Sequence, residues 1–234
     1  MSDHIVSAYD EELQRLARDI AEMGGIAEGM IIEAIQALLR FDMVMARKII
    51  KDDKDLDRLQ RQVEDDAILT IAKRQPMGSD LREVVSTLRI SNDLERCGDL
   101  AKNIAKRVIA VDGQFQPPKL VHGIEHMAEL AQAQLTNVLD AYVSKDTDKA
   151  EQVWQNDDEI DAMYTSIFRE LLTYMMEDPR NITLCTHLLF CAKNVERIGD
   201  HATNIAETVI YQVTGSQVEE ERPKGDNSTT PVKS

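Results

Sequence analysis

The sequence predicts an all-α protein made of two tandem, pseudo-symmetric three-helix bundles, and two observations lead to this prediction. The stretch ERCGDLAKNIA at residues 95–105 recurs as ERIGDHATNIA at residues 196–206. An internal repeat with a period of roughly a hundred residues indicates that one structural unit was used twice. The composition is that of helices, because Ala, Leu, Ile, Met and charged residues dominate and aromatic residues make up only 4%.

Apolar residues at i, i+3 and i+4 spacing predict three helices in the first half, over residues 3–40, 42–75 and 80–110. Asp42 is the candidate N-cap of the second of these helices. Asp80, followed by Glu83 three positions later, is a candidate capping box for the third helix. The Pro, Gly and Ser residues between these two helices predict a turn.

The second half repeats the plan, with helices predicted over residues 118–144, 146–176 and 181–214. Pro118 occupies a favoured first-turn position, and Asp146 has the capping role of Asp42. The Asp178–Pro179 pair predicts the break before the last helix, and Gly215 predicts its end.

A linker with Asp112, Gly113 and the Pro117–Pro118 pair separates the halves. We therefore expect a first repeat over residues 1–114 and a second over residues 115–216. The tail at residues 217–234 lacks apolar periodicity, which predicts disorder.

The net charge of −15 argues against nucleic-acid binding, which needs a basic surface, and favours divalent cations or a basic protein partner. Cys97, Cys185 and Cys191 give no disulfide framework. The N-terminal segment lacks the apolar region of a signal peptide, and no apolar run reaches the ~18 residues of a membrane span. We expect a cytoplasmic protein.

Each predicted bundle carries two pairs of acidic residues four positions apart, a spacing that places both carboxylates on one helix face. One pair lies in the middle helix, and the other lies in the repeated motif, where an asparagine extends the row. The row on the motif helix lies roughly opposite the apolar stripe of that helix, which predicts that the motif acids face out of their own bundle. The ten candidate site residues are Asp53, Asp57, Glu95, Asp99 and Asn103 in the first half and Asp157, Asp161, Glu196, Asp200 and Asn204 in the second.

The acidic pairs of neighbouring helices should lie side by side if the second and third helices form an antiparallel hairpin. A turn centred on residue 77 places Asp57 opposite position 97, between Glu95 and Asp99. A turn centred on Pro179 places Asp161 in the same relation to the pair at 196 and 200. Both halves should therefore gather four carboxylates.

Such a cluster needs positive charge, because like charges four apart on a helix cost about 0.2–0.5 kcal/mol per pair. A cation held by oxygen ligands would supply it, and Mg, Mn, Ca or iron ions suit such ligands. Arg96 and Arg197 could supply part of it instead. A mid-helix Gly costs about 1 kcal/mol relative to Ala, so Gly98 and Gly199 predict a close backbone approach.

Other chemical signatures are weaker. His122, Glu125 and His126 match the HxxEH pattern of a class of zinc proteases. The match lies beside the linker and has no counterpart in the first half, which favours an exposed helix start. The sequence lacks the Glu-x-x-His pairs of a di-iron bundle, and it also lacks a nucleophile–base pair or Gly-rich phosphate loop. We expect no enzymatic activity.

The doubled E-R-x-G-D-x-A-x-N-I-A motif, with D-x-x-x-D on the preceding helix, resembles the PhoU family of phosphate-signalling regulators over about residues 5–213. The resemblance implies metal clusters of iron, zinc, manganese or magnesium on the acidic pairs, with the two asparagines adjoining. It also implies a homodimer that represses the phosphate-starvation response together with a Pst-type phosphate ABC transporter and a PhoR-type sensor histidine kinase. The sequence departs from the family pattern at Cys97 and at Lys106, where the second repeat has Glu207, so equal metal occupancy of the halves is not implied.

The resulting hypothesis is a cytoplasmic metal-binding adaptor that damps phosphate uptake and signalling. Two alternatives stay open. One is a di-metal carboxylate enzyme, such as a hydrolase or oxidase, and the other is a structural helical protein without metal.

Overall fold

The computed structural model describes residues 2–111 and 118–218, and within these ranges the chain is helical apart from its turns and the residues after Thr214. The all-α prediction is confirmed. The predicted linker residues 112–117 and the predicted tail from residue 219 onward lie outside the described residues. The elements are α1 (Ser2–Arg40), α2 (Met43–Arg74), α3 (Ser79–Ala110), α4 (Pro118–Ser144), α5 (Thr147–Gln155), α6 (Asp157–Glu177), the 3₁₀ turn η1 (Pro179–Asn181) and α7 (Ile182–Thr214).

Local capping explains several helix ends, as the sequence predicted. Asp42 Oδ1 accepts hydrogen bonds from the backbone N–H groups of Val44 and Met45, both at 2.9 Å, and so satisfies the first turn of α2. Asp146 does the same for α5 by accepting from Lys149 N–H at 3.0 Å. Gly215 has φ of +78° and ends α7, a conformation that glycine adopts without strain.

The predicted capping box at the start of α3 is wrong. The N-cap of α3 is Gly78, which has no side chain with which to cap the helix. Glu83 instead accepts a hydrogen bond at 2.9 Å from Lys145 Nζ at the end of α4. A lysine from the other half therefore replaces the backbone partner that the local pattern predicted.

The single helix predicted over residues 146–176 is also wrong, because α5 ends at Gln155 and α6 begins at Asp157. Gln134 of α4 donates a hydrogen bond from Nε2 to the carbonyl oxygen of Asn156 at 2.9 Å. A side chain from another helix thus satisfies a backbone group at the interruption. In the first half, α2 continues through the equivalent position without a break.

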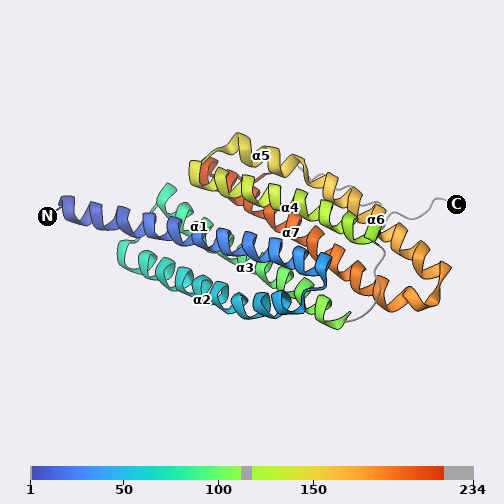
Figure 1. Cartoon of the computed structure of the whole chain (residues 1–234). Helices are drawn as coiled ribbons and strands as arrows, with labels where there is room; N and C mark the ends of the chain where they lie inside the picture. Colours follow the sequence, from blue (N-terminus) through green and yellow to red (C-terminus); the bar gives the residue numbers. More distant parts are fainter. Residues whose placement is uncertain (1, 112–117, 219–234) are drawn as a thin grey trace.

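The helices lie along a common long axis, with α1, α2 and α3 on one side and α4 to α7 on the other (Figure 1). The chain direction reverses between the halves, because α4 runs opposite to α1 and α7 runs opposite to α3 (Figure 1). Consequently, the α2–α3 turn and the α6–α7 turn lie at opposite ends of the molecule.

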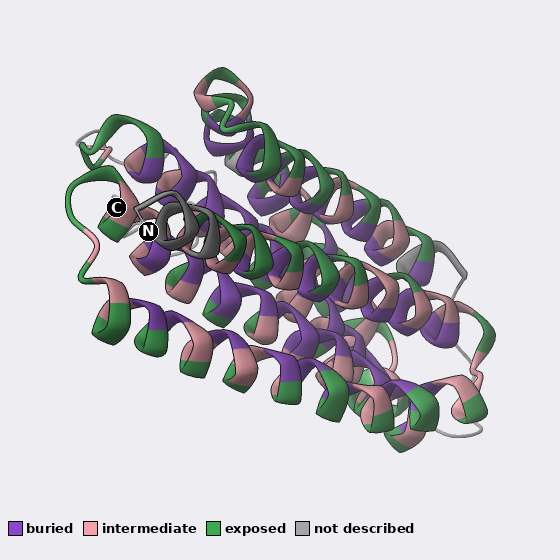
Figure 2. Ribbon diagram, turned by 90° about the vertical axis from the view of Figure 1, so that its left-hand side faces the viewer, coloured by how far each residue is buried: buried purple, intermediate pink, exposed green. Residues whose placement is uncertain are grey.

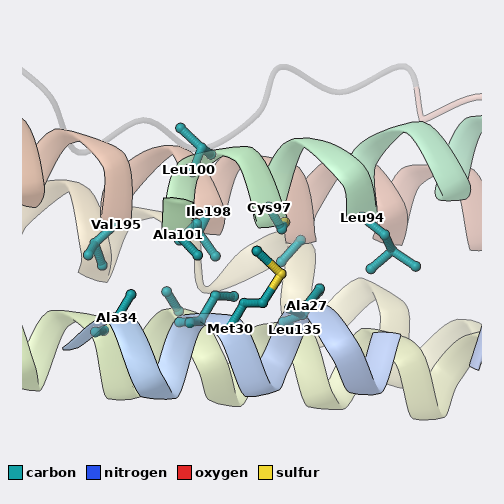
Figure 3. Packing of buried hydrophobic residues seen from close by; sticks show 14 of the residues in the cluster. Ala27, Met30, Ala34, Leu94, Cys97, Leu100, Ala101, Leu135, Val195 and Ile198 are labelled. Atoms are coloured by element: carbon teal, nitrogen blue, oxygen red, sulfur yellow. The ribbon is translucent and has the colours of Figure 1, made fainter. Parts of the chain in front are cut away.

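The two halves share one hydrophobic core. Each helix buries the face turned toward its neighbours and exposes the outer face (Figure 2). The buried apolar residues of both halves form one continuous cluster. Figure 3 shows Ala27 and Met30 of α1, Cys97 and Ala101 of α3 and Leu135 of α4 in this core. Small Ala and Cys side chains allow the helices to pack closely where the halves meet.

Polar contacts also join the halves. His201 Nδ1 of α7 lies 2.8 Å from Asp93 Oδ1 of α3, and both side chains are largely buried. The hydroxyl groups of Thr87 and Tyr142 lie 3.3 Å apart between α3 and α4. Because hydrogen bonds are directional, these pairs fix the register of one half against the other.

No helix in the described part of the chain is both long enough and apolar enough to cross a lipid bilayer.

Candidate metal centres

Two glycines set the spacing of the helices that carry the acids. A Cβ atom on Gly98 would collide with the side chain of Leu56 in α2, and one on Gly199 would lie 2.8 Å from Ile160 Cδ1 in α6. The predicted close approach at both glycines is therefore confirmed. It brings the acidic row of α2 against that of α3, and the row of α6 against that of α7.

In the first half, a lysine lies between the acidic rows. Lys102 Nζ of α3 donates to Asp53 Oδ2 of α2 at 2.6 Å, and it also donates to Asp99 Oδ1 on its own helix. Arg96 adds a second cation, with Nη1 at 3.1 Å from Asp99 Oδ2 and Nε at 3.4 Å from Glu95 Oε2. Arg96 thus supplies part of the positive charge, as predicted, but the sequence reasoning missed Lys102.

The first-half carboxylates are close enough to change one another's pKa values. Burial raises the pKa of Glu95, and the charges of Asp99 and Asp57 raise it further. Burial also raises the pKa of Asp53, against the opposing effect of Lys102. Burial tends to lower the pKa of Lys102, yet its hydrogen bonds to the two aspartates outweigh this effect and raise it. The predicted placement of Asp57 alongside Glu95 and Asp99 is therefore present.

In the second half, Glu196 lies within the electrostatic reach of Asp200 and Asp161. Its side chain is buried, and its Oε1 atom accepts a hydrogen bond from Lys193 Nζ at 2.6 Å. Burial raises the pKa of Glu196, with Lys193 opposing the shift and the charges of Asp200 and Asp161 adding to it. Asp161 is buried, Asp200 is half-buried, and Asp157 is the first residue of α6.

The acids are less exposed than a position opposite the apolar stripe of the motif helix predicts. Asp53, Asp161 and Glu196 are buried, and Asp57, Glu95, Asp99 and Asp200 are half-buried between the paired helices. The physical reason is tertiary: α2, α1 and α7 all pack on α3, and α6, α4 and α3 all pack on α7. The helix face opposite the apolar stripe is therefore covered as well.

The asparagines of the motif are half-buried beside the acids. Asn103 Oδ1 lies 3.5 Å from Lys106 Nζ, and Asn204 accepts a hydrogen bond from Thr208 through its backbone carbonyl. Glu207, the counterpart of Lys106, accepts a hydrogen bond at 3.1 Å from Trp154 Nε1 of α5. This partner of Glu207 was not evident from the sequence, because α5 is distant along the chain.

Two buried oxygen atoms indicate where a cation would fit. Oε2 of Glu196 is buried and accepts no hydrogen bond from the described residues, and the buried Oε2 of Glu95 has the ion-pair contact with Arg96 Nε at 3.4 Å but no hydrogen bond from them. Buried polar atoms are normally satisfied, so each such atom requires an explanation. An oxygen-only ligand set that includes them suits hard cations such as magnesium, manganese or iron.

The side-chain arrangement does not form a preassembled metal centre. Across residues 2–111 and 118–218, no three His, Cys, Asp or Glu side chains are grouped so that they could hold an ion. In the first half, Lys102 Nζ lies between the oxygens of Asp53 and Asp99. A metal ion that binds there has to displace the lysine from these two carboxylates.

The HxxEH stretch lies on the exposed start of α4, as expected. His122 Nδ1 lies 2.9 Å from Glu125, and His126 Nδ1 lies 3.3 Å from Glu129. Both histidine side chains are more than 60% exposed, at 67% and 63% respectively. Each histidine therefore pairs with a glutamate one turn along its own helix, and they do not share a ligand position.

Comparisons with known proteins agree with this architecture. A family model described as "PhoU domain" matches residues 20–108 and again residues 124–209. A Rhizobium meliloti (strain 1021) protein named "Phosphate-specific transport system accessory protein PhoU homolog" is 62% identical over 97% of this chain and 96% of its own length. A Caulobacter vibrioides (strain NA1000 / CB15N) protein of the same name is 50% identical over 97% of this chain and 98% of its own length.

Two crystal structures match the fold. PhoU from Pseudomonas aeruginosa superposes with a TM-score of 0.86 and 36% identity, covering 89% of this chain and 100% of that one. The phosphate transport system regulatory protein PhoU from Streptococcus pneumoniae superposes with a TM-score of 0.83 and 30% identity, covering 91% of this chain and 100% of that one. The chain is thus a member of the PhoU family.

Proposed function

We propose that this chain is a negative regulator of phosphate uptake and of phosphate-starvation signalling. In this proposal it is a cytoplasmic, metal-binding adaptor that acts with a Pst-type phosphate ABC transporter and a PhoR-type sensor histidine kinase. The observation that carries the proposal is the doubled carboxylate cluster in a chain whose relatives are named accessory proteins of phosphate-specific transport. The family is one of accessory proteins and not of enzymes.

The acids are the proposed metal ligands. Asp53, Asp57, Glu95 and Asp99, with Asn103 adjoining, would hold the metal in the first half. Asp157, Asp161, Glu196 and Asp200, with Asn204 adjoining, would hold it in the second. Support comes from the buried Oε2 atoms of the two glutamates, which accept no hydrogen bond from the described residues, and from the raised pKa values of these glutamates.

A bound divalent or trivalent cation would neutralise the mutual repulsion of the carboxylates and link two helices of each half. This chain's residues define which helices are linked: Asp53 of α2 faces the motif of α3, and Asp161 of α6 faces the motif of α7. The exposed faces of these stiffened helix pairs would be the surfaces on which the protein partners dock. Within the described residues, no observation favours the alternative of a di-metal hydrolase or oxidase.

A reporter assay tests the regulatory proposal. The native gene is replaced by one encoding Asp99→Asn and Asp200→Asn together, and a phosphate-starvation reporter is measured in phosphate-rich medium. We expect derepression in the double variant, together with weaker recovery of the purified transporter ATPase and sensor kinase in a binding assay. Asp65→Asn, at an exposed position of α2, is the matched control and should retain repression. Full repression and unchanged partner binding in the double variant would contradict the proposal.

A further inference from the structure

A hollow of about 160 Å³ lies between α1 and α4. Its apolar lining residues are Ile31, Ile32, Ile35, Leu39 and Ala128. Ile32 is 36% exposed at this hollow, so part of its apolar surface faces solvent. A cavity of ~150 Å³ holds a benzene-sized group, and this hollow therefore has room for about one large apolar side chain.

A second hollow, of about 390 Å³, lies between α1 and α2, and Gly25 and Gly29 line it. A Cβ atom built on either glycine comes within 4 Å of no neighbouring helix in the described part of the chain. Gly24 differs, because its added Cβ would lie 2.7 Å from Leu139 Cδ1 of α4. A glycine inside a helix costs about 1 kcal/mol relative to Ala. Packing within the described chain explains this cost at Gly24 but not at the other two glycines.

The two hollows flank one exposed face of α1. Gly25, Gly29, Ile32 and Gln36 follow one another at i, i+4, i+7 and i+11, a spacing that keeps them on the same side of the helix. Figure 1 shows α1 between α2 and α4, the helices that complete the two hollows. We refer to these four residues and the two flanking hollows as the α1 face. It extends over about three helical turns.

The α1 face is acidic. The hollow against α2 is lined by three carboxylates and one ammonium group, from Glu33, Asp52, Asp55 and Lys48. Two further carboxylates, those of Glu125 and Glu129, line the hollow against α4. Such a surface attracts a basic partner. It repels a second copy of this chain, because the copy carries the same acids and a net charge of −15.

The present partners of these acids are mostly exposed. Lys48 Nζ lies 2.5 Å from Glu33 Oε1 and 3.6 Å from Asp52 Oδ2, and its side chain is 56% exposed. Glu125 and Glu129 pair with His122 and His126, each one turn away on the same helix and more than 60% exposed. Exposed ion pairs contribute little free energy, so a docking cation can replace them at low cost.

We propose that the α1 face is the docking site for a basic amphipathic helix of a protein partner. The inference depends on the proposed adaptor function and deepens it, because it names a docking surface and the chemistry of the partner. One large apolar side chain of the docked helix enters the hollow beside Ile32, and its backbone crosses α1 over Gly25 and Gly29. Lysine or arginine side chains on its flanks reach the carboxylates of α2 and α4.

A helix fits this surface better than an extended peptide does. An extended peptide gains affinity from main-chain hydrogen bonds to a free strand edge, whereas the backbone groups in the middle of α1 bond within the helix. A helix satisfies its own backbone and contributes side chains at i, i+3 and i+4. The missing side chains of Gly25 and Gly29 allow the two helix backbones to approach closely.

Gly29→Leu tests the shape of the surface. The full chain is immobilised, and its affinities for the purified transporter ATPase and for the purified cytoplasmic part of the sensor kinase are measured by surface plasmon resonance. The new side chain occupies the hollow and has a higher helix propensity than glycine, so the thermal unfolding midpoint should be equal or higher. Binding of the partner should nevertheless weaken by about tenfold or more. Ala162→Leu, at an exposed position of α6, is the matched control and should retain the native affinity.

Reversal of charge tests the acidic character of the surface. Glu125→Lys combined with Glu129→Lys should weaken partner binding by about tenfold or more, because the basic helix then meets like charges. Glu159→Lys combined with Glu170→Lys makes the same change in net charge at exposed positions of α6 and should weaken binding by less than about threefold.

The outcomes separate this inference from the adaptor function. Loss of partner binding in Gly29→Leu and in the Glu125, Glu129 double variant, with both controls near the native affinity, supports the inference. Native affinity in Gly29→Leu overturns it and leaves the adaptor function intact. A native dimer that Gly29→Leu converts to a monomer in analytical ultracentrifugation also overturns it, because the face is then covered by a second copy. Failure of the native chain to bind either purified partner overturns the adaptor function itself.

Discussion

Lys102 Nζ of α3 lies 2.6 Å from Asp53 Oδ2 of α2, and their side chains are only 19% and 7% exposed. This pair joins two helices whose close approach is set by the glycine four residues earlier in α3. Breaking a buried ion pair from one side leaves a charge without a partner, which costs more than the pair itself contributes. The stability of the first half should therefore be sensitive to the loss of one partner of this pair.

Lys102→Met should destabilise the metal-free protein by about 1–3 kcal/mol, because Asp53 loses its hydrogen-bond donor while it stays buried. Urea denaturation in the presence of a chelator measures the change. Lys102→Met combined with Asp53→Asn should cost less than Lys102→Met alone, because the unpaired charge is gone. A double variant that is less stable than the single variant would show that Asp53 does not depend on Lys102.

The helix contacts at the motif glycines should not tolerate a methyl group. Gly98→Ala and Gly199→Ala should each lower the free energy of unfolding by about 1–3 kcal/mol, because the added methyl group overpacks against Leu56 or Ile160. The higher helix propensity of Ala offsets about 1 kcal/mol of this loss. Gly25→Ala in α1 is the control, since nothing lies within 4 Å of its added Cβ, and it should be slightly stabilising. Equal effects at all three glycines in thermal unfolding would contradict the close approach.

The contact between the halves at His201 and Asp93 should contribute measurably to stability. His201→Leu, which copies Leu100 of the first repeat, leaves Asp93 buried without this partner and should cost about 1–3 kcal/mol. His126→Leu is the control, because that side chain is 63% exposed, and it should change stability by less than about 0.5 kcal/mol. Identical unfolding midpoints for the two variants would show that the contact across the halves does not contribute to stability.

The carboxylates should also make stability depend on pH. Burial and neighbouring acids raise the pKa of Glu95 and of Glu196, so the folded chain retains protons that the unfolded chain has released. Proton binding by these two glutamates therefore contributes to the stability of the fold. This contribution is fully present below the ordinary glutamate pKa of about 4.3, and it is lost as the pH rises through the raised pKa of the folded state. Glutamine keeps the neutral form at all pH values.

The double variant Glu95→Gln, Glu196→Gln should accordingly be more stable than the native chain at pH 7 in chelator. Its advantage should shrink as the pH falls toward about 4.5. Glu159→Gln, at an exposed position, should show no such trend. Urea denaturation at a series of pH values measures the difference, and an advantage that grows as the pH falls would mean that the shift has the opposite sign.

The sequence predicted features that depend on local residues. Asp42 and Asp146 were identifiable as caps because a cap bonds backbone groups only two or three residues away. The juxtaposition of the acidic rows also followed, because an antiparallel hairpin pairs residues at equal distances from its turn.

Features that depend on distant helices were not predictable in this way. The helix break at Asn156 needs Gln134, 22 residues earlier, and the burial of the acids needs the packing of α3 against α7. Lys102 could have been noticed, because it lies one turn beyond Asp99 in the motif, yet its bond to Asp53 appears only once α2 is placed. The contact of Lys193 with Glu196 in the second half was likewise not predicted, since Lys193 lies before the repeated motif.

The claim that the repeated acids hold metal is tested most directly by the metal content of the purified chain. The native protein and the Glu95→Gln, Glu196→Gln variant are prepared without chelator, supplied with manganese and iron, dialysed and measured by elemental mass spectrometry. The account predicts bound metal in the native chain and a marked loss in the variant. Equal metal content in both proteins, or none in the native chain, would contradict it.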